Sequence, residues 1–572
     1  MNIVKPTEAV RFVALSYMWQ QSGDEGHVQL ECSNINELEL PGGLTNISLP
    51  NIISDAISLC KGLGETYLWV DRFCIIQDDK ESKHHQIRGM DRIYRSANFT
   101  IVAALNRRDS QGIPGFSGRP RISSLWRPAY ECEVEGRGIR PNCITAIVDS
   151  SLWNKRGWTF QERVFSTRCL FITEFQVAFA CERGTATEEL TYCHQRLPRN
   201  GDSMMMAYAE SDSEKEVKQQ EDHQIRSFTR RSFSTGGINY STKSTISLVD
   251  YFHFVENYTQ RQLSFGTDIL NAFTGIGNSL GESFDSGMIF GLPEKYIPQA
   301  LMWSCFGLVE TSVETPQIPS WSWASSVKPA DYGWRSGRSP LDEALDEDLV
   351  RIASLVYFHF QDPKLGLRRL AVQERWIDHL STIKELANED KLPGLEGKYN
   401  PGVTRSTDTW RNCPHSPWTS LAHTALDPGA CSIANAFPGS LIFNTTVASL
   451  RLDHDTRDIY SRAEFSERDV AIRDSKGGLV GLLNKMSLDW IDAHKGDDKT
   501  FEFIILCGSL ADWSSRKSRA KYSKNFDTWL LNVMLIERLP FQPFIARRVD
   551  VGYIFAHKWK ECNPWWETVV LC

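Results

Sequence analysis

Two short segments of the chain carry side chains that could do chemistry. One places Asp71 and Arg72 directly after the apolar run YLWV, and the other, SLWNKRGWTFQERVFS, carries Trp158 and Glu162. Because Trp158 and Glu162 are four residues apart, they share one face of a helix, where the carboxylate stands beside an indole. A carboxyl group in such partly dry surroundings has a shifted pKa, which is common at catalytic sites.

A third segment, FVALSYMW, contributes Ser16, Tyr17 and Trp19 directly after an apolar run near the N-terminus. The apolar runs predict strands, and the polar residues follow their carboxyl ends. In a parallel sheet these ends meet along one edge, where helix N-termini and loop amides converge on ligands. The sequence therefore predicts one crevice that all three segments line.

The three segments, in this order, resemble the fungal heterokaryon incompatibility (HET) domain. The resemblance rests on the motifs LSYxW, LWVDxxCIxQ with a downstream QIxxMxxIYxxA, and RGWTFQExxxS. It implies a role in fungal nonself recognition, in which the HET domain triggers cell death when incompatible cells fuse. The chain departs from the family at Gln20, where a glycine is common, and its short N-terminus is typical of a truncated gene model.

HET domains are in turn distantly similar to the Toll/interleukin receptor (TIR) fold, a flavodoxin-like sheet. Some TIR domains hydrolyse NAD with a helix glutamate four residues after a tryptophan, and Trp158 and Glu162 reproduce that spacing. The resemblance implies that Glu162 stabilises an oxocarbenium-like ribose and that NAD is a substrate, with no cofactor and no metal. The substrate-binding residues implied by it are Ser16, Tyr17, Trp19, Asp71, Arg72 and Trp158.

Each of these residues also has a purely structural interpretation. Trp158 could pack in a core, because indoles at helical spacing usually do. Asp71 and Arg72 could belong to a buried ion network, and Glu162 could be a salt-bridge partner of Arg156. The alternative function is therefore a non-catalytic death-signalling adaptor that acts by self-association, with incompatibility proteins as its other partners.

Composition narrows the remaining function classes. The chain has 572 residues, a net charge of -8 and no basic block, which argues against nucleic acid and anionic membranes as partners. No window approaches about 18 consecutive apolar residues and no signal peptide follows Met1. The 14 cysteines form no CxxC pair, as in reduced proteins, so a cytoplasmic location is expected.

Alternating apolar strands and amphipathic helices predict an α/β fold with a TIR-like (flavodoxin-like), mainly parallel sheet. Helices are expected from Pro50, from a capping box of Asp78 and Glu81, and after a cap at Ser151. The expected strands cover residues 12–15, 67–70, 99–105, 169–173 and 177–181.

An α+β, β-rich C-terminal region is expected to follow the HET domain. Ser-, Glu-, Lys- and Gln-rich sequence separates the two and predicts a flexible insertion. The expected parts are a HET domain at 1–195, the insertion at 196–237, a helical segment with a PSWSWA turn at 238–330, and the β-rich region at 331–572 with a loop-like insertion near 405–438.

Overall fold

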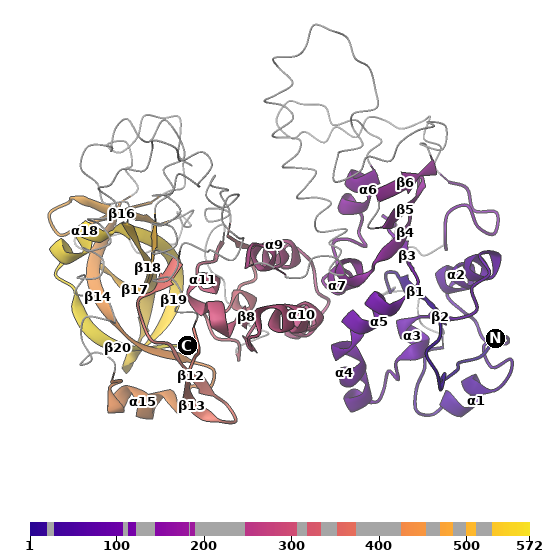
Figure 1. Cartoon of the computed structure of the whole chain (residues 1–572), viewed down its shortest axis with the longest axis horizontal. Coiled ribbons are helices and arrows are strands. Elements are labelled where there is room, and N and C mark those ends of the chain that lie inside the picture. The colour runs from indigo at the N-terminus through magenta and orange to yellow at the C-terminus, as the bar shows by residue number, and fades with distance from the viewer. Residues whose placement is uncertain are drawn as a thin grey trace, which may run out of the picture. The chain divides into compact units, whose positions relative to one another are not determined.

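The structure is a computed structural model of the chain, in which contacts define two compact units (Figure 1). Unit 1 comprises Met1–Ser244 and Arg261–Ile276, and unit 2 comprises Thr245–Gln260 and Gly277–Cys572. The expected insertion at 196–237 lies outside the described residues, and the domain limits at 195, 237 and 330 stay predictions. The described residues are 1–19, 28–106, 112–121, 144–181, 184–188, 246, 248–305, 317–332, 352–372, 425–453, 470–483, 499–510, 529–540 and 542–572.

Unit 1 is built on a mixed sheet with the strand order β2-β1-β3-β4-β5-β6. The first four strands in this order are parallel, and β5 and β6 extend the sheet in antiparallel fashion. A short connection such as the one between β4 and β5 allows only an antiparallel pair, because parallel strands need a long crossover. The strands are β1 (Val13–Ser16), β2 (Leu68–Trp69), β3 (Thr100–Ala103), β4 (Arg168–Ile172), β5 (Val177–Cys181) and β6 (Gly184–Thr187).

The described helices of unit 1 lie on both faces of this sheet, with α2 on one side and α5 and α7 on the other (Figure 1). Helix α2 follows Pro50 as expected, because proline has the backbone angle that a helix start needs. The helices are α1 (Ile35–Glu39), α2 (Asn51–Gly62), α3 (Asp71–Cys74), α4 (Lys80–Arg88), α5 (Met90–Ser96), α6 (Ile144–Ser150) and α7 (Trp158–Phe165).

Two expected helix starts are wrong in detail. Asp79 rather than Asp78 caps α4, and the helix predicted from there breaks into α4 and α5 at Gly89. Ser151 does not cap α7: its hydroxyl donates to the Val148 carbonyl and accepts from the Asn154 amide, which closes a turn after α6. The helix that carries Glu162 therefore begins only at Trp158.

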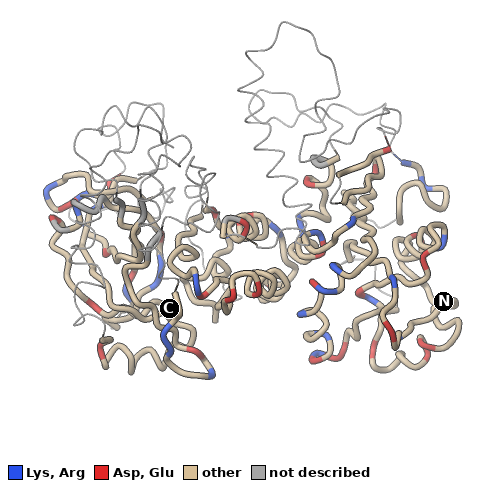
Figure 2. Tube along the Cα trace, in the orientation of Figure 1, with Lys and Arg blue, Asp and Glu red and all other residues tan. Residues whose placement is uncertain are grey.

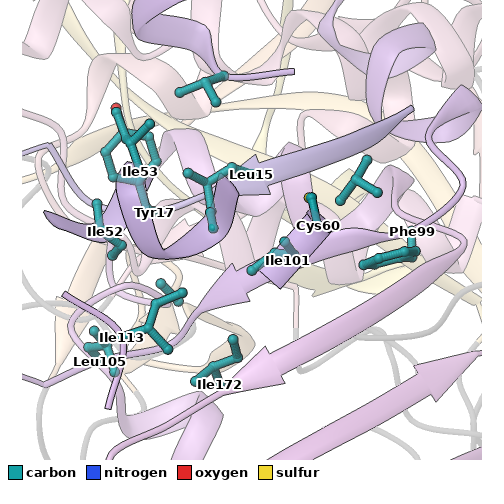
Figure 3. Packing of buried hydrophobic residues seen from close by; sticks show 14 of the residues in the cluster. Leu15, Tyr17, Ile52, Ile53, Cys60, Phe99, Ile101, Leu105, Ile113 and Ile172 are labelled. Atoms are coloured by element: carbon teal, nitrogen blue, oxygen red, sulfur yellow. The ribbon is translucent and has the colours of Figure 1, made fainter. Parts of the chain in front are cut away.

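The core between α2 and the sheet follows from the alternation of side chains along the strands. Leu15 and Ile101 point toward α2 and pack against Ile52 and Ile53 (Figure 3). Strand neighbours that point the other way pack in a second cluster around Trp153. Ser16, which follows Leu15, therefore points to the same side as Trp153.

Unit 2 confirms the β-rich C-terminal region, because its largest sheet is antiparallel except for one pair. Six strands close a barrel in the order β14-β17-β18-β19-β16-β15 and back to β14. The barrel is drawn in orange and yellow in Figure 1. Its strands are β14 (Leu441–Asp453), β15 (Val470–Arg473), β16 (Leu479–Leu483), β17 (Phe501–Leu510), β18 (Trp529–Leu539) and β19 (Gln542–Phe555).

Strands and helices outside the barrel complete the described part of unit 2, and α10 runs across the boundary from unit 1. Strand β20 pairs with β14 and β19, and the hairpin of β12 and β13 continues the sheet from β14. The elements are α9 (Leu248–Thr259), α10 (Thr274–Phe284), β7 (Met288–Ile289), β8 (Leu292–Pro293), α11 (Ile297–Ala300), β9 (Ser304–Cys305), β10 (Ala330–Asp331), β11 (Ile352–Ser354), β12 (His359–Asp362), β13 (Gly366–Arg369), α15 (Pro428–Ala434), α18 (Ala556–Trp559) and β20 (Trp565–Leu571).

Two expectations for this part of the chain need correction. The helical segment expected within 238–330 is interrupted, because α9 ends at Thr259 and only short 3-10 turns lie between it and α10. The loop-like insertion near 405–438 contains helix α15, which Asp427 caps, while 405–424 lies outside the described residues. The proline at the start of that helix is the sequence feature that indicates a helix there.

Charge and hydropathy complete the description of the two units. Lysines and arginines alternate with acidic residues along the described trace (Figure 2). Within the described residues, no helix has both the length and the apolar character needed to cross a membrane.

Replacement of Trp559 by alanine is expected to destabilise unit 2 by about 3 to 5 kcal/mol, because it leaves a large cavity in the barrel core. Trp559 is fully buried, belongs to the cluster inside the barrel, and donates to Thr446 Oγ1 over 3.0 Å. Urea unfolding followed by fluorescence measures the change. Trp565→Ala is the matched control, since this indole is 40% exposed and its loss should cost little.

Candidate active site

Ser16 links strand β1 of unit 1 to the helix that carries Glu162. The Ser16 hydroxyl donates to Glu162 Oε2 over 2.5 Å and accepts from Trp153 Nε1 over 2.8 Å. Since a hydroxyl has one proton, the indole donor leaves that proton for the carboxylate. Ser16 is fully buried and Glu162 is only 7% exposed, so the bond lies away from bulk water.

Asp71 gathers the residues that follow β1 and β2. Its Oδ2 accepts from Trp19 Nε1 over 2.7 Å, and its Oδ1 accepts from the Arg72 amide over 2.8 Å. The Tyr17 hydroxyl lies close enough to act on the pKa of Asp71, which it lowers. The Arg72 guanidinium lies 4.6 Å from the centre of the Trp19 ring, which is a cation–π contact. This arrangement holds because β1 and β2 are parallel and end at the same edge of the sheet.

Three further residues complete the site, and the sequence interpretation had not included them among its substrate-binding residues. The Tyr94 hydroxyl donates to the Leu15 carbonyl over 3.4 Å and lies close enough to Glu162 to lower the pKa of that carboxyl group. Trp153 donates to Ser16, and Arg156 acts through its positive charge on both Asp71 and Glu162. Their signals were present in the sequence, because each lies in or beside a motif segment. We call Ser16, Tyr17, Trp19, Asp71, Arg72, Tyr94, Trp153, Arg156 and Glu162 the site cluster.

Burial raises the pKa of Glu162 to about 7, and it is the largest influence on this group. The negative charge of Asp71 raises the pKa further, whereas the bond from Ser16, the charge of Arg156 and the bond from Tyr94 lower it. Burial also raises the pKa of Asp71, against the bonds from Trp19 and the Arg72 amide. The site cluster therefore holds two carboxyl groups whose charged forms are disfavoured by their surroundings.

The structure brings together all but one of the residues predicted from the sequence. Trp158 is the exception: it starts α7 one turn before Glu162, is half-buried, and makes no hydrogen bond to the described members of the site cluster. Arg163, the neighbour of Glu162 in sequence, bonds to Asp149 over 2.7 Å, whereas the positive charge of Arg156 acts on Glu162. Whether the site cluster opens into a crevice stays a prediction.

The site cluster suits chemistry that develops positive charge. A carboxylate that is fixed by a hydroxyl in dry surroundings attracts a cation more strongly than it would in water. Burial raises the pKa of the nearby Cys74 thiol to about 11, so this cysteine is a poor nucleophile. The described residues contain no group of His, Cys, Asp and Glu side chains that could hold a metal ion.

The raised pKa of Glu162 predicts how stability depends on pH. A glutamic acid in the unfolded chain titrates near 4.3, so between about pH 4.5 and 7 the folded state binds the proton more tightly. Stability contributed by this proton is present at low pH and is lost as the pH rises through 7. Glu162→Gln should therefore gain roughly 3 kcal/mol relative to the wild type between pH 5 and 8.

Urea unfolding at several pH values measures this difference. Glu8→Gln, at an exposed position, is the control and should keep a constant offset from the wild type. A Glu162→Gln offset that is likewise independent of pH would contradict the raised pKa.

Comparison with protein-family models finds that residues 12–162 match the family described as Heterokaryon incompatibility protein (HET). No curated protein and no solved structure matches the chain. The matched stretch runs from the residue before β1 to Glu162, and it contains every member of the site cluster. The chain therefore carries a heterokaryon incompatibility (HET) domain in unit 1.

Proposed function

We propose that this HET protein acts in fungal nonself recognition and triggers cell death by hydrolysing NAD at the site cluster. Heterokaryon incompatibility is the general role that the family match supports. The enzymatic step rests on one observation: Glu162 is a buried carboxyl group that accepts a hydrogen bond from Ser16 and whose pKa is near 7. A protein built only to pack would gain nothing from leaving such a group in its core.

In the proposed reaction the bond between the nicotinamide nitrogen and the ribose breaks. The bonding electron pair leaves with nicotinamide, which becomes neutral, and positive charge develops on the ribose. The Glu162 carboxylate stabilises that charge. Water then attacks the ribose and releases one proton, so that the products are nicotinamide, ADP-ribose and a proton.

The other members of the site cluster have supporting roles in this proposal. NAD carries a positive charge on its nicotinamide ring, which the two carboxyl groups of Asp71 and Glu162 would attract when ionised. Trp19 and Trp158 are half-buried indoles that could stack on a ring. Arg156, whose positive charge acts on both carboxyl groups, would bind the pyrophosphate.

Strand order offers further support for a TIR-like origin of this chemistry. The parallel part of the sheet has the order β2-β1-β3-β4, which doubly wound flavodoxin-like sheets share. The site cluster lies at the carboxyl end of β1, where such sheets bind ligands. The proposal places the protein in the cytoplasm, where NAD is available, with self-association or an incompatibility partner as the trigger.

A non-catalytic adaptor is the second candidate, and a specific observation favours it. Glu162 and Ser16 are almost closed to solvent, and the site cluster satisfies much of its own hydrogen bonding. Such networks also occur where they only fix a fold. In this alternative the HET domain signals by self-association and the Glu162 carboxyl group catalyses no reaction.

Glu162→Gln separates the two candidates. The amide keeps the volume of the side chain but removes the charge, so NAD loss and cell death should disappear together while the fold persists. NAD content and viability of cells expressing each form measure this, with circular dichroism of the purified protein as the fold control. Glu81→Gln, on the far less buried helix α4, is the matched variant and should stay lethal. A folded Glu162→Gln protein that still kills the cells would contradict the enzymatic proposal and support the non-catalytic adaptor.

The pH dependence of the reaction gives an independent prediction. Because Glu162 must be charged, nicotinamide release by the purified protein should rise with pH through about 7. Asp71→Asn removes a negative charge that raises the pKa of Glu162, so the rise should move to lower pH. Measurement of kcat against pH for both proteins tests this, and an Asp71→Asn profile displaced to higher pH would contradict it.

A further inference from the structure

A segment remote in sequence from the HET motifs clasps the start of the Glu162 helix. The Gly157 amide donates to the Gln262 carbonyl over 2.7 Å, and the Gln262 amide donates to the Lys155 carbonyl over 2.7 Å. These bonds form a parallel bridge between Arg156 and Gln262. The backbone of Arg156 is thereby fixed between two hydrogen bonds that come from outside the motif.

Arg261 adds side-chain contacts to the same place. Its guanidinium donates to the Asn154 carbonyl, to Asn154 Oδ1 over 2.9 Å and to the Arg156 carbonyl over 3.4 Å. The guanidinium also lies 4.5 Å from the centre of the Phe160 ring on α7. A planar cation with several donors ties the turn to the helix in a way that a single point charge does not.

The same segment contacts the helix further along its length. A Cβ atom on Gly275 would lie 2.8 Å from Gln161 Oε1 and 3.3 Å from the Phe165 ring, so the segment packs directly against side chains of α7. At the helix start, a Cβ atom on Gly157 would lie 2.5 Å from Leu263 Cδ2. A side chain at either glycine would displace Gln161 or Leu263.

The path of the chain gives this packing a regulatory meaning. Arg261–Ile276 belongs to unit 1, yet the residues on both sides of it, Thr245–Gln260 and Gly277 onward, belong to unit 2. Two covalent links therefore connect unit 2 to the segment within a short stretch of sequence. The segment that holds the turn at Arg156 is therefore attached to unit 2 at both of its ends.

We propose that the 261–276 segment positions Arg156 and Glu162 within the site cluster, that Arg261 is its main positioning residue, and that unit 2 controls the HET site by holding or releasing this segment. The inference rests on the proposed function only in that nicotinamide release is one of its two measurements. Glu162 follows the clasped turn within two helical turns, so displacement of that turn moves the carboxyl group relative to Ser16, Asp71 and Tyr94.

The test uses the full chain with Arg261→Ala, and Phe265→Ala as the matched control, because Phe265 lies in the same segment and is 68% exposed. Hydrogen exchange at the Gly157 amide should become at least about tenfold faster in Arg261→Ala, because its acceptor is no longer held in place. In the same protein, kcat for nicotinamide release should fall by at least about tenfold.

The pH profile distinguishes positioning from mere stability. The charge of Arg156 lowers the pKa of Glu162, whereas Asp71 raises it and Ser16 and Tyr94 lower it through their bonds. If Arg156 is released, the rise of kcat should move to higher pH, which a uniform loss of folded protein would not cause. Arg261→Lys keeps the charge without the planar donor set, so it should restore part of the activity.

The outcomes separate this inference from the proposed function. A folded Arg261→Ala protein with unchanged Gly157 exchange and an unchanged pH profile would overturn it. If the wild type releases no nicotinamide, the proposed function is wrong. Faster hydrogen exchange at the Gly157 amide in Arg261→Ala would then still support the positioning role of the 261–276 segment. If Arg261→Ala does not fold, Gly157→Ala replaces it, because the added methyl group displaces Leu263. Hydrogen exchange is then measured at the Phe160 amide.

Discussion

The hydrogen bond from Ser16 to Glu162 is the interaction on which the site depends. It joins strand β1 to α7 in the buried interior, and Trp153 donates to the hydroxyl that makes it. Burying a carboxyl group is unfavourable unless polar groups replace the water molecules that solvated it. Around Glu162 these groups are hydroxyls, helped by the positive charge of Arg156. Such partners stabilise the charged form only in part, so the pKa settles near neutrality.

Because the charge of Glu162 is only partly compensated, the carboxyl group costs stability but stays free of a tightly bound cation. A bidentate arginine on Glu162 would stabilise the charged group and lower its pKa, but it would also occupy the carboxylate. Arg156 acts on both Glu162 and Asp71 without neutralising either fully. The site cluster therefore keeps two carboxyl groups in a state that costs stability, which is the usual sign of residues retained for a task other than packing.

The sequence predicted what local patterns control. The run VAFAC and its polar flanks gave the strand β5 with correct ends, and the parallel strands placed Ser16, Asp71 and Glu162 together because their carboxyl ends meet. Tyr94 and Trp153 lie in the motif segments but were not assigned to the site, because nothing in their local sequence shows that they meet Glu162 and Ser16. The break after Thr259 was also missed, because the bonds of Gln262 to the turn before α7 outweigh helical propensity.

The limits of the family match differ from the limits of the folded unit. The match ends at Glu162, but α7 continues to Phe165, and the 261–276 segment packs along it from Gly157 to Phe165. A site whose geometry depends on a clasp from outside the matched region cannot be independent of what the clasp is attached to. The chain enters and leaves that segment from unit 2, so the residues that hold the start of the Glu162 helix lie outside the matched region and are joined to unit 2 at both ends.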